Sequence, residues 1–334
     1  MNLPKIILTF SLSLFLLIGL AGVYKKKRGD RRLAHLSEKV ESKAQVVTPV
    51  PVNSVKKNQK IGLPAVSAEA FNRMEENERA DLVDRLFATN ESRLPIVETI
   101  TYAPRVPWMK GRPAWLADYA AHYNTTRHFI ARSLNQKIDY FNQKIFPGDK
   151  FNVLKKDVEF YLLVDLSTAR MWFYALDTAK AERYLLKTYK VGLGRRDSFK
   201  LSGCLTPKGR YLLGQKVALY QPKVMGYFHD RQIEMMRIFG TRWIPFEKEL
   251  EGASQKARGL GLHGAPWIND PEKGLIEDRE RIGSYESDGC IRLYSEDIEE
   301  LFAIIISKPT VVEIVSAFAE AKLPGFPASV RGLR

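Results

Sequence analysis

The longest apolar stretch of the chain lies near its start, from residue 6 to residue 23. Lys5 precedes this stretch, and four basic residues follow it at 25–28. It is long for the core of a cleaved signal peptide and sufficient for one membrane-spanning helix. We therefore expect residues 1–24 to form an uncleaved membrane anchor. The basic residues after it favour a cytoplasmic location for the chain that follows. Long domains often cross the membrane regardless of charge, so the pattern leaves the orientation of the anchor open.

The next part of the chain is polar. Basic residues interrupted by prolines fill residues 25–66, which is typical of a disordered linker. Apolar residues then recur at near-helical spacing after Ser67, a candidate N-cap. We therefore expect a helix within residues 67–90.

Residues 91–156 have the pattern of a small α+β unit. Ile96–Tyr102 has the residue types of a strand, and two short runs at Trp115–Tyr123 and Thr126–Leu134 predict helices. A Pro-Gly turn at 147–148 leads into alternating apolar residues, which predict a second strand. The expected order is strand, helix, helix, strand.

Short runs of β-forming residues dominate from residue 157 to residue 317. The runs 160–166 and 169–176 predict a hairpin, and one helix is predicted at Ser295–Ile306 with Ser295 as its cap. Further strands are predicted at 184–191, 211–213, 217–220, 261–263 and 310–315. We expect a mainly β, β-sandwich-like domain with few helices, followed by a tail at 318–334.

Charge and cysteine content narrow the choice of partners. The chain of 334 residues has a formal net charge of +14, but twelve Lys and Arg against three acidic residues lie in its first 66 positions. The remainder lacks the dense basic face of a nucleic-acid binder, so we expect no nucleic-acid partner. Two cysteines, Cys204 and Cys290, are too few for a disulfide scaffold, and no CxxC spacing indicates a zinc site. We expect no metal and no cofactor.

Candidate chemistry lies at Cys290 and at His263 upstream of it. A thiol is an effective nucleophile when a base adjoins it or its pKa is lowered, and His263 can supply that base. Gly264 and Gly289 leave open backbone beside the two residues, and Arg292 can bind a carboxylate with its planar fork. These residue types suit acyl transfer from a peptide with a free carboxylate. The alternative interpretation is that Cys290 is a small buried side chain and that His263 has a structural role.

The segment 157–317 resembles the catalytic domain of the L,D-transpeptidases, the YkuD family, through several motifs in the right order. His263-Gly264 matches the upstream motif, and the Thr-Pro-x-Gly motif is present at 206–209. The nucleophile motif of the family is Ser or Thr followed by His-Gly-Cys. It reads here Ser287-Asp288-Gly289-Cys290-Ile291-Arg292-Leu293.

The resemblance implies a mechanism on peptidoglycan. His263 would take the proton of Cys290, and the thiolate, stabilised as an ion pair, would attack the carbonyl of the third stem-peptide residue. The terminal D-amino acid would leave, and an amine would resolve the thioester to give a 3-3 crosslink or attachment to a protein. Backbone N–H groups near Gly289 and Cys290 would donate to the oxyanion. Water in place of the amine would make the protein an L,D-carboxypeptidase.

The remaining site residues receive positioning roles. Ser287 or the Gly264 carbonyl would hold the second nitrogen of the imidazole, and Arg292 would hold the substrate or order the loop. Asp288 replaces the second histidine of the family motif. An alternative hypothesis is therefore a catalytically weak protein that binds the cell wall. The charged segment 268–284 is long for the family and is a lid, a partner contact or a solvated excursion.

The unit at 91–156 resembles a LysM module in its Tyr-Asn-Thr-Thr sequence at 123–126 and its Pro-Gly-Asp-Lys-Phe-Asn-Val sequence at 147–153. This resemblance implies binding to glycan strands, with a generic α+β spacer as the alternative. The expected partners are peptidoglycan stem peptides, glycan strands and, through residues 6–23, the membrane. The expected location is the periplasmic face of the inner membrane. An unrelated cysteine hydrolase on the cytoplasmic face is the competing hypothesis.

Overall fold

The computed structural model describes residues 80–135, 143–214 and 218–328, which all belong to one compact unit, Ala65–Arg334. The expected anchor, the linker and the first part of the helix expected at 67–90 lie outside the described residues. Within these residues no helix is both long and apolar enough to cross a membrane. The first described helix, α3, covers Val83–Phe87.

The segment 91–156 folds in the predicted order of strand, helix, helix and strand. Strand β1 (Val97–Thr101) pairs antiparallel with β2 (Lys150–Leu154), and helices α4 (Leu116–His122) and α5 (Arg127–Asn135) lie between them in sequence. The hydroxyl of Thr126 accepts a hydrogen bond from the Phe129 amide at 2.8 Å, which satisfies a free amide at the start of α5.

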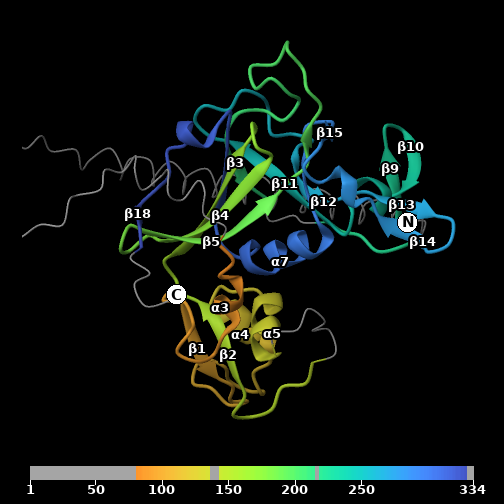
Figure 1. Ribbon diagram of the computed structural model, residues 1–334. Coiled ribbons are helices and arrows are strands. Elements are labelled where there is room, and N and C mark those ends of the chain that lie inside the picture. Colours follow the sequence, from red (N-terminus) through yellow and green to blue (C-terminus); the bar gives the residue numbers. More distant parts are fainter. Residues whose placement is uncertain (1–79, 136–142, 215–217, 329–334) are drawn as a thin grey trace, which may run out of the picture. The chain divides into compact units, whose positions relative to one another are not determined.

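A mixed sheet forms the body of the chain after residue 157 (Figure 1). Its strands follow the order β16, β12, β11, β7, β17, β3, β4, β5 and β18, and β8 pairs with β11. The predicted hairpin is present as β3 and β4, and the expectation of a mainly β domain with few helices is confirmed. The strands are β3 (Val158–Asp165), β4 (Arg170–Asp177), β5 (Glu182–Lys190), β7 (Gly209–Leu213), β8 (Ala218–Leu219), β11 (Arg242–Glu249), β12 (Gly261–Gly264), β16 (Ile291–Leu293), β17 (Thr310–Val315) and β18 (Phe326–Pro327).

Shorter elements lie beside this sheet. Strand β6 (Leu193–Gly194) pairs in parallel with β15 (Tyr285–Ser287), and two antiparallel hairpins are inserted between the strands of the sheet. The hairpins are β9 (Met225–Phe228) with β10 (Arg231–Glu234), and β13 (Trp267–Asp270) with β14 (Gly274–Glu277). The short helices are α6 (Met236–Phe239) and two 3-10 turns, Arg279–Arg281 and Phe318–Glu320.

Helix α7 (Ser295–Ile305) shows where the predicted cap is wrong. Tyr294 is the N-cap, and Ser295 is the first helical residue. The Ser295 amide donates to the Glu277 carboxylate at 2.6 Å. A carboxylate from β14 therefore satisfies an amide at the start of the helix, a task that the sequence assigned to the Ser295 hydroxyl.

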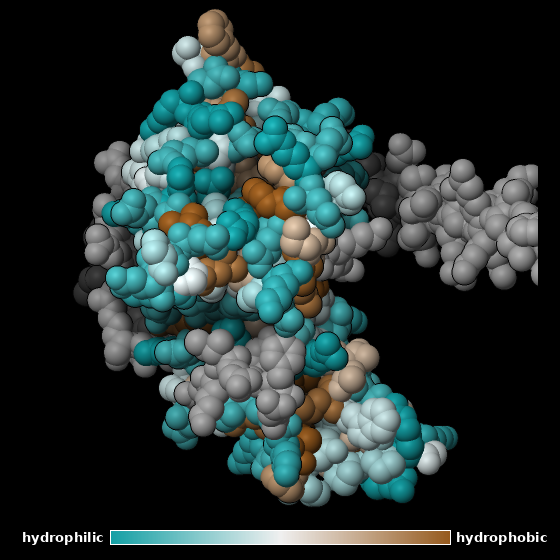
Figure 2. Space-filling view, turned by 90° about the vertical axis from the view of Figure 1, so that its right-hand side faces the viewer, coloured by the Kyte–Doolittle hydropathy of each residue, from teal (hydrophilic) through white to brown (hydrophobic). Residues whose placement is uncertain are grey.

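The helical unit and the sheet share one hydrophobic core. Phe129 of α5 and Leu154 of β2 belong to the same buried cluster as Phe160 of the sheet. The Thr126 hydroxyl donates to the Ala303 carbonyl oxygen of α7 at 2.7 Å, and α5 lies next to α7 in Figure 1. Phe129 of α5 and Leu301 of α7 are both fully buried, so the contact between these helices belongs to the interior. Polar side chains cover most of the face shown in Figure 2.

Replacing Phe129 by alanine is expected to lower the free energy of unfolding by about 3–5 kcal/mol, because it removes a fully buried ring where the two parts meet. Replacing Phe199, which is 98% exposed, is expected to change it by less than about 0.5 kcal/mol. Urea denaturation followed by circular dichroism measures both values. Equal stability of the two variants would contradict a shared core.

Candidate active site

Two parallel strands bring the backbones of the candidate histidine and cysteine close together. Strand β12 pairs with β16, so that Leu262 lies opposite Ile291 and His263 opposite Arg292. Because successive side chains of a strand point to opposite faces, Leu262 and Ile291 enter the core while His263 and Arg292 share the other face. Cys290 directly precedes β16, two residues from Arg292. Its side chain belongs to the buried core cluster and is near enough to Arg292 for that charge to act on the thiol.

The turn before β16 fixes the backbone that carries the thiol. The Ser287 hydroxyl donates to the Cys290 carbonyl oxygen at 2.6 Å and accepts from the Gly289 amide at 3.1 Å. Gly289 has a φ of +119°, and a Cβ at this position would lie 2.9 Å from the Leu205 carbonyl oxygen. Only glycine fits there without strain. The sequence predicted open backbone at this residue, and the turn shows its physical reason.

His263 is 3% exposed, and its Nδ1 lies 2.7 Å from the Gly264 carbonyl oxygen. A carbonyl only accepts, so Nδ1 carries the proton and Nε2 keeps its lone pair. Burial, with the charge of Arg292, lowers the pKa of His263 to about 3. Of the two groups expected to hold the ring, the Gly264 carbonyl does so. The expectation for Ser287 is corrected, because its hydroxyl is engaged in the turn instead.

Cys290 is 9% exposed, and its Sγ lies 3.7 Å from the Gly259 carbonyl oxygen. Burial raises the pKa of its thiol to about 11, while a backbone hydrogen bond from Gly261 and the charge of Arg292 act in the opposite direction. At neutral pH the resting site therefore holds a neutral thiol and, in His263, a neutral imidazole. In this state the two groups do not form the expected ion pair. Cys204 is a second free, buried thiol, and the two cysteines form no disulfide.

Arg292 carries a half-buried guanidinium. Its backbone amide and carbonyl both bond to Gly192, at 2.8 and 2.9 Å, which fixes its position in β16. Its Nε is buried without a hydrogen bond, and no carboxylate of the described residues forms an ion pair with it. Burial, together with the charge of Arg281, lowers the pKa of Arg292. The charges of Asp288 and Asp278 act on the guanidinium without pairing with it, so it can still bind an anionic group directly.

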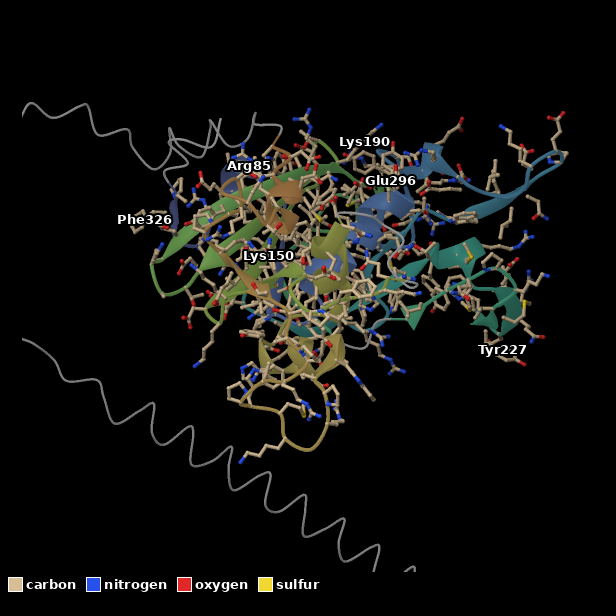
Figure 3. All side chains as sticks on the ribbon, turned by 90° about the horizontal axis from the view of Figure 1, so that it is seen from below. Arg85, Lys150, Lys190, Tyr227, Glu296 and Phe326 are labelled. Atoms are coloured by element: carbon tan, nitrogen blue, oxygen red, sulfur yellow. The ribbon has the colours of Figure 1, made fainter. Side chains whose placement is uncertain are left out.

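An aromatic cluster that the sequence did not single out covers the imidazole. The Phe239 ring lies edge-on to His263 with 5.3 Å between ring centroids, and Trp243 lies at 5.8 Å. Phe228 of β9 packs against Phe239 at 5.7 Å. In the sequence these residues have the pattern of ordinary core positions, because only the fold brings α6 and the β9–β10 hairpin next to β12. Tyr227 on the same hairpin points away from the body and is 77% exposed (Figure 3).

The Thr-Pro motif at 206–207 contacts the strand pair β6–β15 next to the site. The Thr206 hydroxyl accepts a hydrogen bond from the Gly194 amide at 2.8 Å. Gly194 belongs to β6, and Gly194 pairs with Ser287 of β15. The motif therefore holds in place the strand pair that leads into the Cys290 turn, and its role in this chain is structural.

Two features differ from the family pattern. Asp288 forms an ion pair with Arg195 at 2.7 Å, and the side chains of both residues are 62% exposed. The long segment 268–284 folds into the end of β13, strand β14 and a 3-10 turn, in which Arg279 pairs with Glu296 of α7 at 2.6 Å. The segment is thus folded and bonded to α7.

A thiol, a neutral imidazole and a guanidinium lie at the end of two paired strands, and these groups are chemically suited to acyl transfer through a cysteine nucleophile. In the part of the chain that the structure describes, no group of three or more His, Cys, Asp or Glu side chains is placed to hold a metal ion. Residues 159–314 match the family model of YkuD, the L,D-transpeptidase catalytic domain. The segment that carries Cys290 and His263 is therefore an L,D-transpeptidase catalytic domain.

Solved structures that align with part of this chain include Bd1075 from Bdellovibrio bacteriovorus and the helical cell shape determining protein Pgp2 from Campylobacter jejuni. Bd1075 is 15% identical, with 52% of this chain and 51% of that chain covered and a TM-score of 0.32. Pgp2 is 17% identical, with 51% of each chain covered and a TM-score of 0.30. L,D-transpeptidase 3 from Mycobacterium tuberculosis is 15% identical, with coverages of 51% and 76% and a TM-score of 0.30. The chain spans about half the length of the first two, and no curated protein matches it.

The neutral resting state predicts how Cys290 reacts with iodoacetamide. The thiolate is the reactive form, and the pKa of the thiol is about 11, so the alkylation rate is expected to rise about tenfold per pH unit between pH 7 and pH 10. A preformed thiolate–imidazolium pair would give a rate that is constant near neutrality. Mass spectrometry of the Cys290 peptide measures the rate, and a plateau between pH 6 and pH 8 would contradict the neutral pair.

Proposed function

We propose that the chain as a whole is a peptidoglycan L,D-transpeptidase in which Cys290 is the nucleophile and His263 the base. The observation that carries the proposal is the neutral pair of these residues beside the unpaired Arg292, within the segment that matches the L,D-transpeptidase domain. A stem peptide ends in a carboxylate, and a guanidinium without a counter-charge binds such a group through two parallel hydrogen bonds.

Binding of this carboxylate also prepares the base. The charge of Arg292 is one of the two causes that lower the pKa of His263. A carboxylate on Arg292 neutralises that charge, and the pKa of His263 then rises. The imidazole therefore becomes a stronger base when the substrate is in place, although burial still disfavours its protonated form.

In the first half-reaction Nε2 of His263 takes the thiol proton while Sγ of Cys290 attacks the carbonyl carbon of the third stem residue. The Gly289 amide already donates to Ser287, which leaves the Cys290 amide as the oxyanion donor of this turn. The imidazolium then protonates the nitrogen of the terminal D-amino acid, the C–N bond breaks and a thioester remains.

In the second half-reaction an acceptor amine attacks the thioester and forms the crosslink. Water as the acceptor gives L,D-carboxypeptidase action, which is the second candidate function because both reactions share the same acyl-enzyme. The geometry of the Cys290 turn gives less support to a catalytically weak wall-binding protein, because the thiol, the imidazole and their supporting hydrogen bonds are all present.

The other parts of the chain suggest how the enzyme is held at its substrate. We infer that residues 91–156 are a LysM-like module that binds glycan strands, supported by the order of its elements and by the exposed ring of Trp115, over which Arg112 lies at 4.5 Å. We also infer that residues 6–23 anchor the protein in the inner membrane with its catalytic part in the periplasm. Activity of an alkaline phosphatase fused after residue 66 tests this orientation.

Incubation of the full-length protein with disaccharide-tetrapeptide is expected to release D-alanine and to give a crosslinked dimer, detected by mass spectrometry. Cys290→Ala is expected to abolish both products, and His263→Gln to slow them by about 10²–10⁴-fold, because the thiol loses its base. Cys204→Ala is the matched control, since Cys204 is a buried thiol outside the site, and it is expected to keep its activity. Product from Cys290→Ala would refute the assignment of the nucleophile.

The glycan-binding proposal predicts that Trp115→Ala lowers co-sedimentation with insoluble peptidoglycan, because the exposed indole offers a flat apolar surface to a sugar ring. We expect a loss of affinity of roughly tenfold, as for an aromatic contact residue at a binding surface. Phe199→Ala, an exposed aromatic residue outside residues 91–156, serves as the control. Unchanged sedimentation of Trp115→Ala would argue for a spacer.

A further inference from the structure

The turn that carries Cys290 also carries an exposed carboxylate, that of Asp288. One of its oxygens, Oδ1, lies 2.7 Å from Nη2 of Arg195, and Oδ2 has no partner among the described residues. The Arg195 amide donates to the Ser287 carbonyl oxygen at 2.9 Å, so the backbone of Arg195 is bonded to the same turn. Asp288 is therefore held in place two residues from the nucleophile, with one oxygen free.

Arginine side chains also lie near the nucleophile. Arg292 forms no ion pair with a described carboxylate, and Arg281 lies close enough to lower the pKa of Arg292, although Asp278 and Glu286 both pair with Arg281. The charge of Arg292 therefore repels an ammonium group that approaches the thioester. Asp288 is the carboxylate whose charge acts on both Cys290 and Arg292.

The acceptor of a transpeptidase has the charge that such a carboxylate recognises. A primary amine of the lysine type has a pKa near 10.4, so it reaches the enzyme as an ammonium ion at neutral pH. Water, the competing acceptor, is uncharged. A carboxylate beside the thioester therefore favours the amine over water by raising the local concentration of the cation.

We propose that Asp288 is the binding site for the ammonium group of the acceptor and that it sets the ratio of transfer to hydrolysis. The inference rests on the proposed transpeptidase function and specifies its second half-reaction. It also gives a role to the residue that replaces the second histidine of the family motif.

The step balances with the groups described. The bound ammonium gives one proton to solvent, and its nitrogen attacks the thioester carbonyl carbon. The C–S bond breaks as the C–N bond forms. The second proton that the nitrogen loses passes through His263 to the sulfur of Cys290, which restores the neutral pair.

The experiment uses the full-length protein with an isotopically heavy disaccharide-tetrapeptide as donor and light disaccharide-tripeptide as acceptor. Heavy–light dimer reports transfer, and heavy tripeptide reports hydrolysis. For Asp288→Asn the ratio of dimer to tripeptide is expected to fall about tenfold at low ionic strength and less at high salt, because a charge contact is lost. With hydroxylamine, which is uncharged at neutral pH, the ratio of hydroxamate to tripeptide is expected to stay within about twofold.

Two controls separate acceptor binding from damage to the turn. Glu286→Gln removes the neighbouring carboxylate and is expected to leave the dimer ratio unchanged. Acylation of Cys290 by a carbapenem, measured by the added mass, is expected not to slow in Asp288→Asn, because the charge of Asp288 raises the pKa of the Cys290 thiol. An equal fall with the ammonium acceptor and with hydroxylamine, or an unchanged dimer ratio, overturns the inference alone. A wild-type protein that neither acylates nor forms product overturns the proposed function and the inference with it.

Discussion

The parallel pairing of β12 with β16 is the interaction on which the rest of the site depends. The inner residues Leu262 and Ile291 are fully buried, and the outer residues His263 and Arg292 lie on the face of the chemistry. Because the side-chain period of a strand is two, a slip of one residue would send the imidazole into the core and a leucine into the site. The burial of two aliphatic side chains therefore fixes the register of His263 and Arg292.

Neither the thiol nor the imidazole of the site at rest is charged. Burial keeps both the thiol and the imidazole neutral, at the cost of their reactivity as isolated groups. The guanidinium of Arg292 forms no ion pair, so the binding of an anion there changes the electrostatic environment of both the thiol and the imidazole. Asp288 is exposed and paired with Arg195, yet its charge acts on both Cys290 and Arg292.

Features that depend on local patterns were predictable from the sequence. The β3–β4 hairpin follows from two β-forming runs beside each other, and the strand–helix–helix–strand unit from a change of hydrophobic period. Features that depend on remote residues were not predictable. The start of α7 is satisfied by Glu277, which precedes it by a whole folded segment, and Ser287 bonds to its own turn. The aromatic cover of His263 comes from an inserted hairpin and a short helix, where no motif marks Phe239 or Trp243. The unpaired state of Arg292 depends on the fold, because a sequence does not show which carboxylates lie beyond ion-pair distance.

The contact between α5 and α7 shows that the family match and the folded core have different boundaries. The family match begins at residue 159, yet Phe129 and Leu154, which precede it, lie in the same core as the sheet. The segment that matches the family model is thus shorter than the segment that forms the complete hydrophobic core. If a recombination event moved the matched stretch alone into another gene, one side of α7 would face water until a new segment covered it. In this lineage the helical unit and the catalytic sheet are therefore expected to be inherited together, and substitutions at their junction to be accepted in compensating pairs.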